Sequence, residues 1–207
     1  MLTLHHLNDS RSQRILWLLE ELGTPYEMKR YQRNATTRLA PPELKAVHPL
    51  GKSPVITDGD IKIAESGAIV DYIIRRYGNG KLMPAPGSAD YESYNEWLHY
   101  SEGSAMLPLM LNLYVSRLKE AAAPLQPRID SETANHLGYI NGALKGRGVL
   151  CRQVVFRGRY PDELCRRDGQ GVRQARAVSR LERLAVAHAC PAGVPALDRE
   201  GRGLSVR

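Results

Sequence analysis

The sequence predicts an α/β domain over residues 1–80, followed by an incomplete all-helical (all-α) domain over residues 88–146. Strand-like and helix-like segments alternate in the first stretch, whereas the second has the three- and four-residue apolar spacing of helices. A linker with prolines and a glycine, residues 81–87, separates them. The 207 residues, 43% hydrophobic and 25% charged, suit one or two globular domains.

The first strand and the first helix are predicted within residues 2–23. Leucines in residues 2–7 are spaced as in a strand, and a polar cluster follows them. Ser10 with Gln13 fits the Ser-x-x-Gln capping box that begins a helix, and Gly23 is a typical helix stop. These signals indicate a strand followed directly by a helix.

The segments that follow give the order βαβ-α-ββα. They are a strand at 26–31, a short helix at 41–47, strands at 53–57 and 61–64, and a helix at 65–78. The Asp58-Gly59-Asp60 sequence is a hairpin signal between the last two strands. Ala68 is expected on the apolar face of the final helix, beside isoleucines and tyrosines. This order predicts a four-stranded mixed sheet with helices on both faces.

This order, with a proline at the start of the third strand, is the thioredoxin-like arrangement. Three runs within it resemble the glutathione-binding half of the cytosolic glutathione S-transferases, in a serine-type form found in bacteria and fungi. They are SRSQRILWLLEELG (10–23), APPELKAVHPLGKSPVI (40–56) and AESGAIVDYI (64–73). The resemblance covers residues 1 to about 80, and Gly-Lys-Ser-Pro-Val with Glu-Ser is its most diagnostic part.

The resemblance implies a set of glutathione contacts. Pro54 matches the family's cis-proline, which aims the backbone of Ser53 at the cysteinyl part of glutathione. Glu65 and Ser66, at the amino end of a helix, match the residues that hold the γ-glutamyl group. Lys52 would face the glycyl carboxylate.

Ser10 matches the family position whose hydroxyl donates a hydrogen bond to the glutathione sulfur and so favours the thiolate. A serine in a capping box is also sufficiently explained as a helix cap, and the same holds for Ser66. Ser12 and Asn8 are the competitors for the sulfur contact.

The resemblance implies an enzyme that conjugates glutathione to a small apolar electrophile, with reduction of a peroxide as a second activity. Glutathione is then a co-substrate and the chain a homodimer; no metal, nucleic acid or membrane is expected to take part. An alternative is a non-catalytic module that binds glutathione or a protein partner. The start of the chain lacks a secretory layout and no stretch is long enough to span a membrane, so the cytoplasm is expected.

Residues 88–146 resemble the first two long helices of the family's second domain. Apolar and aromatic residues follow helical spacing from residue 89, Pro108 should bend this helix, and a second helix is predicted at about 130–144. Trp97, Tyr100 and Met106 are candidates for the wall of the electrophile pocket. Helix-to-helix core packing is the alternative for each of them.

The net charge of +7 lies entirely in residues 147–207, which hold 13 Arg, no Lys and all three cysteines. Residues 1–146 have 16 Lys and Arg against 16 Asp and Glu, and 147–207 have 13 against 6. The cysteines lack metal-site spacing, and no aromatic interleaving supports nucleic-acid binding.

A slip of one base near codons 147–149 is our hypothesis for this change of composition. Reading the codons for residues 149–165 one nucleotide out of register permits Tyr-Phe-Val-Gly and a Ser-x-x-Asp capping box, which the family's second domain carries at this point. An inactive, truncated transferase is then a further alternative. A genuine Arg-rich tail, with an amphipathic helix over residues 178–188, is the competing interpretation.

Overall fold

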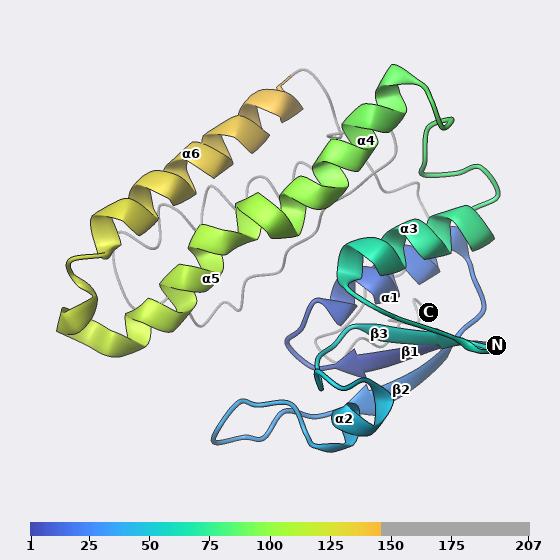
Figure 1. The fold of residues 1–207 in the computed structure, drawn as a ribbon, viewed down its shortest axis with the longest axis horizontal. Helices are drawn as coiled ribbons and strands as arrows, with labels where there is room; N and C mark the ends of the chain where they lie inside the picture. Colours follow the sequence, from blue (N-terminus) through green and yellow to red (C-terminus); the bar gives the residue numbers. More distant parts are fainter. Residues whose placement is uncertain (146–207) are drawn as a thin grey trace, which may run out of the picture. The chain divides into compact units, whose positions relative to one another are not determined.

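A computed structural model describes residues 1–145 of the chain (Figure 1). These residues divide into two compact units, Met1–Lys81 and residues 82–145. The Arg-rich segment, the proposed base slip and the alternative helix at 178–188 lie outside the described residues.

The first unit contains the predicted mixed sheet. Its strands are β1 (Leu2–Leu7), β2 (Glu27–Tyr31), β3 (Val55–Asp58) and β4 (Ile61–Ala64), in the spatial order β2-β1-β3-β4. The β1 and β2 strands are parallel, whereas β3 is antiparallel to both β1 and β4. Gly59, at φ 58°, supplies the left-handed residue of the tight β3–β4 turn. The α/β thioredoxin-like prediction is confirmed.

Helices cover both faces of this sheet (Figure 1). The α1 helix (Ser12–Leu22) packs beside α3 (Ser66–Tyr77) on one face. On the other face the short α2 helix (Glu43–Val47) packs through Leu44 against Leu7 and Tyr31. The central strand β1 is therefore covered on both sides.

This double cover explains why β1 is more buried than its leucine pattern indicated. His5 and His6 are both buried, with only 6% of each exposed. Because successive side chains of a strand point to opposite faces, His6 faces α1 and His5 faces the α2 side. Two adjacent histidines thus lie inside the unit.

The α1 helix ends as predicted but begins differently. Gly23 adopts φ 63° and its N–H donates to the Glu20 carbonyl, which closes the last turn. The predicted Ser-x-x-Gln capping box is wrong, because Arg11 holds the cap position and no side chain caps the helix. Ser10 lies before the helix, and its hydroxyl accepts a hydrogen bond from the Ser12 N–H.

The α3 helix confirms the predicted span and corrects its face. Ile69, Tyr72, Ile73 and Ile74 are buried, whereas Ala68 is exposed, since it lies one position outside the buried stripe. Any side chain at Gly78 would collide with the Ile74 carbonyl oxygen, which explains the glycine at this helix end.

The described part of the second unit is helical. Its elements are α4 (Ala89–Tyr100), the π-helical turn η1 (Ser101–Ala105), α5 (Met106–Val115), the 3₁₀ segment η2 (Ser116–Ala122) and α6 (Gln126–Leu144). Ser88 caps α4 by accepting the Tyr91 N–H at 3.2 Å.

The α4, η1 and α5 segments form a continuous helical run that packs beside α6 (Figure 1). Pro108 has no N–H to donate to the preceding turn, and the π-helical turn lies just before it. The helical run is therefore irregular just before Pro108, while the bend itself stays a prediction. The α6 helix begins four residues before its predicted start, with Pro127 in its first turn. Within residues 1–145, no helix combines the length and apolar character needed to cross a membrane.

Candidate functional site

Ser10 lies in the loop between β1 and α1, just before the amino end of that helix. Its side chain is half-buried. The hydroxyl donates to the Leu7 carbonyl at 2.8 Å and accepts from the Ser12 N–H at 3.2 Å. The Ser12 hydroxyl is a further neighbour at 2.7 Å. The hydroxyl therefore lies near the positive end of the helix dipole.

The two competitors for a ligand contact are already engaged. Ser12 is fully buried, and its hydroxyl contacts His6 Nδ1 at 2.9 Å and the backbone of Leu7. The Asn8 side chain accepts the Arg33 N–H at 2.8 Å and donates to Asp9. Ser10 is the partly exposed hydroxyl of this loop.

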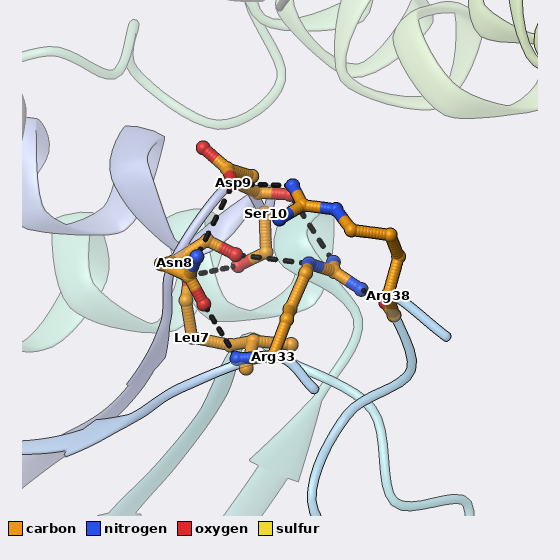
Figure 2. A network of polar contacts seen from close by, with 6 residues as sticks. All are labelled: Leu7, Asn8, Asp9, Ser10, Arg33 and Arg38. Carbon is orange, nitrogen blue, oxygen red and sulfur yellow. Dashed lines mark hydrogen bonds and ion pairs between the residues drawn. The ribbon is translucent and has the colours of Figure 1, made fainter. Parts of the chain in front are cut away.

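Arg33 fixes the same loop from the segment that follows β2 (Figure 2). Its Nε donates to the Asn8 carbonyl at 3.0 Å, and its Nη2 donates to the Asp9 carbonyl at 3.1 Å. Its Nη1 donates to the Arg38 carbonyl at 2.9 Å, which links a second loop to the first. One guanidinium thus holds the backbone carbonyls of both Asn8 and Asp9.

The second predicted motif lies against β1. The Ser53–Pro54 peptide bond is cis, as predicted, and Pro54 is buried. The Ser53 hydroxyl donates to the His5 carbonyl at 2.9 Å, which ties this loop to the central strand. Lys52, immediately before it, is exposed.

The third motif begins α3. Glu65 is exposed and adopts φ 68°, a backbone conformation that is unfavourable for a residue with a side chain and that clusters at functional sites. Ser66 is buried, and its hydroxyl accepts a hydrogen bond from Arg14 of α1 at 3.3 Å. The structure thereby adds the Arg14 guanidinium to the residues predicted from the sequence.

All three motifs are therefore joined to the β1–α1 segment. Ser10 bonds to Leu7, the last residue of β1, Ser53 bonds to His5 of the same strand, and Ser66 bonds to α1. The region carries hydroxyls, a helix amino end, and the cations Arg14 and Lys52, which suits a ligand with carboxylates and a thiol.

The candidates in the second unit form an aromatic cluster. Trp97 is buried, stacks on Tyr139 of α6 with ring centroids 5.2 Å apart, and meets the edge of Tyr100 at 5.3 Å. Tyr100 is half-buried, and its hydroxyl lies 2.7 Å from Nδ1 of His136. Burial, with Tyr139 adding to it, raises the pKa of Tyr100. These contacts give Trp97 a role in packing α4 against α6. Met106, the third candidate, is half-buried at the start of α5.

Nothing in the sequence pattern marked His6, Arg14 and Arg33 as residues of this site. Each acts through a contact with a residue distant in the sequence or buried in a strand, and no local pattern marks such contacts.

Among residues 1–145, no three or more His, Cys, Asp or Glu side chains gather in a way that could hold a metal ion.

The first unit has the fold and the hydroxyl-bearing loops of a thioredoxin-like glutathione-binding domain. The family model described as "Glutathione S-transferase, N-terminal domain" matches residues 1–75. Glutathione S-transferase 1 of Saccharomyces cerevisiae is 36% identical over 171 residues, which cover 72% of this chain and 73% of that protein. The chain belongs to the glutathione S-transferase family, as its motifs predicted.

Two further proteins illustrate the likeness. Glutathione S-transferase 3 of Schizosaccharomyces pombe is 44% identical over 106 residues, and this match covers 51% of the chain but only 43% of that protein. A solved glutathione transferase family member from Pseudomonas fluorescens, with two glutathione bound, is 26% identical with a TM-score of 0.66. That match covers 92% of this chain and 89% of the other.

Proposed function

We propose that this protein is a glutathione transferase in which Ser10 stabilises the glutathione thiolate. The observation that supports this most strongly is the junction of the Ser10, Ser53 and Ser66 motifs on the β1–α1 segment. The names of the relatives, and the glutathione bound in the Pseudomonas fluorescens structure, agree with it.

Ser10 has the chemistry that this role needs. A thiolate is a far better nucleophile than a thiol, and a hydroxyl that donates to the sulfur lowers the thiol pKa. The amino end of α1 adds a positive partial charge at the same place. The thiolate then attacks the electrophilic carbon, an S–C bond forms, and a leaving group such as halide departs with the bonding electrons.

The remaining motifs hold the tripeptide. The backbone of Ser53 pairs with the cysteinyl residue, and Glu65 takes the γ-glutamyl ammonium. The γ-glutamyl carboxylate meets Ser66 and the amino end of α3, where Arg14 supplies the neutralising charge. Lys52 faces the glycyl carboxylate.

The second unit contributes to binding of a small apolar electrophile through Tyr100 and Met106, which retain partly exposed surface. Peroxide reduction is a second activity of the same thiolate. The active form is a homodimer in the cytoplasm, without metal, nucleic acid or membrane. A non-catalytic module would retain glutathione and lack turnover.

The test is Ser10→Ala in the full-length chain, assayed with glutathione and a chlorodinitrobenzene. Loss of one hydroxyl donor to a developing charge should lower kcat/KM about 100-fold. Glutathione affinity should change little, because the other contacts remain. Turnover equal to that of the unmodified protein would contradict the role of Ser10.

Ser116→Ala is the matched control. Its hydroxyl also donates to the carbonyl three residues earlier, Leu113, but it lies on η2 of the second unit. It should leave turnover unchanged, so a loss confined to Ser10→Ala reports the sulfur contact rather than the loss of a serine. An unmodified chain that binds glutathione but turns over no electrophile or peroxide would favour the non-catalytic module.

A further inference from the structure

We propose that Ser12 and His6 are positioning residues that turn the Ser10 hydroxyl toward the glutathione sulfur. This inference rests on the proposed role of Ser10. The three side chains form a continuous row: His6 Nδ1 lies 2.9 Å from the Ser12 hydroxyl, which lies 2.7 Å from the Ser10 hydroxyl. His6 and Ser12 are buried, while Ser10 is at the partly exposed end.

The Ser12 hydroxyl has one proton and several neighbours. It accepts the Leu7 N–H at 3.3 Å, and its own proton can go to Ser10, to the Leu7 carbonyl at 3.2 Å, or to His6. Which of these receives the proton determines what Ser10 can do with its own.

One arrangement satisfies the buried groups and frees the Ser10 proton. If Nδ1 of His6 carries the ring proton, it donates to Ser12, and Ser12 donates to Ser10. Ser10 then accepts from both the hydroxyl and the N–H of Ser12. Both acceptor positions of Ser10 are occupied, and its own O–H is left to donate.

The opposite arrangement prevents Ser10 from donating to the sulfur. If Nδ1 lacks a proton, Ser12 donates to His6. The 2.7 Å contact between the two hydroxyl oxygens then needs the Ser10 proton, so Ser10 donates to Ser12 and no hydroxyl proton faces the sulfur. The tautomer of His6 therefore sets the direction of the whole row.

Reorienting Ser10 toward the ligand gives up one bond, its 2.8 Å contact with the Leu7 carbonyl. The new bond to a thiolate is charge-assisted and therefore stronger than a bond between neutral groups. Burial lowers the pKa of His6, and Arg30, its register partner on β2, lowers it further. The imidazole is thus neutral near pH 7, and its single ring proton, rather than its charge, controls the row.

The experiment measures the thiol pKa of glutathione bound to the full-length protein, from the ultraviolet absorbance of the thiolate as pH is varied. Ser12→Ala should raise the thiol pKa by about half a pH unit, because Ser10 loses the hydroxyl that donates to it. The dissociation constant of glutathione should change less than about twofold, because Ser12 is buried. Ser12→Thr keeps the hydroxyl and should retain the low thiol pKa.

A second pair of variants, at His6, tests the direction in which the hydrogen bonds of the row are donated. His6→Asn keeps an N–H donor near the position of Nδ1, whereas His6→Leu removes it. We expect a raised thiol pKa in His6→Leu and a value close to that of the unmodified protein in His6→Asn. Equal thiol pKa values in these two variants would overturn the proposal, as would an unchanged value in Ser12→Ala.

Ser10→Ala separates this proposal from the proposed function. A thiol pKa that is not lowered in the unmodified protein, or that Ser10→Ala leaves unchanged, removes the proposed role of Ser10 itself. A thiol pKa that rises in Ser10→Ala but not in Ser12→Ala removes the positioning role alone.

Discussion

Asp58 and Ser10 lie at opposite ends of β1, and hydroxyl groups and arginines surround them in different ways. Asp58 pairs in register with Leu2, the first residue of that strand, whereas Ser10 follows its last residue. The Asp58 side chain is 9% exposed, and its carboxylate accepts hydrogen bonds from Tyr72, at 2.8 Å, and from Tyr77.

At the Asp58 end, groups of the protein itself surround the negative charge of the carboxylate. Arg76 lies 3.4 Å from the carboxylate, in addition to the two tyrosines, and these contacts join the β3–β4 hairpin to α3. At the Ser10 end the arginine bonds backbone carbonyls, and the hydroxyl keeps a proton that it can redirect. The two clusters thus differ in what their polar groups contact: those at Asp58 join a strand to α3 around one carboxylate, whereas those at Ser10 hold a loop and leave its hydroxyl partly exposed.

The largest effect on stability is expected from Asp58→Asn. The carboxylate accepts hydrogen bonds from two tyrosines, and bonds to a charged group are worth more than neutral ones. We expect a loss of about 2 kcal/mol in the free energy of unfolding, measured by urea denaturation, and unchanged kcat/KM in the folded protein. Asp71→Asn is the control, because Asp71 pairs with Arg75 on the helix surface and should cost at most about 0.5 kcal/mol. Equal losses in the two variants would contradict the stabilising role of Asp58.

The same site predicts a pH dependence. The hydrogen bond from Tyr77, with Tyr72 and Arg76 adding to it, lowers the pKa of Asp58 below its ordinary value of 3.8, although burial opposes the shift. The contribution of Asp58 to stability is therefore complete above that value and is lost as the pH falls through the lower pKa of the folded state. The difference in unfolding free energy between the unmodified protein and Asp58→Asn should therefore be constant near pH 7 and shrink as the pH falls below about 4. A difference that stays constant below about pH 4 would show that the charge of Asp58 contributes nothing.

Local signals in the sequence predicted the order of elements well. Gly23 and Gly59 act through the conformation of their own backbone, so a short window is enough to recognise them. The cis bond before Pro54 was expected from the family resemblance instead. The Ser10 capping box failed because Ser and Gln at this spacing are compatible with a cap without requiring one.

The contacts that surround Ser10 could not be predicted in the same way. His6 lies in a strand that helices cover on both faces, and in such a strand burial no longer alternates with the sequence. Arg33 reaches the loop from a position 25 residues beyond Asn8 along the chain. Only the fold brings such residues together.

Arg33→Ala should lower activity by loosening the loop that carries Ser10, without greatly destabilising the fold. The guanidinium holds the Asn8 and Asp9 carbonyls, so its loss lets the loop that carries Ser10 move (Figure 2). Small displacements of a catalytic group are costly, and we expect kcat/KM for glutathione conjugation to fall about tenfold. Steady-state kinetics test this, with thermal unfolding to confirm that the folded state persists. A kcat/KM within twofold of the unmodified value would show that the loop holds its position without Arg33.

Arg38→Ala is the matched variant with the smallest expected effect. Arg38 also contacts this loop, but through an ion pair with the Asp9 carboxylate at 2.6 Å in which about half of each side chain is exposed. Solvent screens such a pair, which contributes about 0 to 1 kcal/mol, and the backbone carbonyls remain held by Arg33. We therefore expect kcat/KM to change less than about threefold, with a weaker effect still at high salt. If Arg38→Ala matched Arg33→Ala, charge near the loop rather than the bonds to its carbonyls would be what positions Ser10.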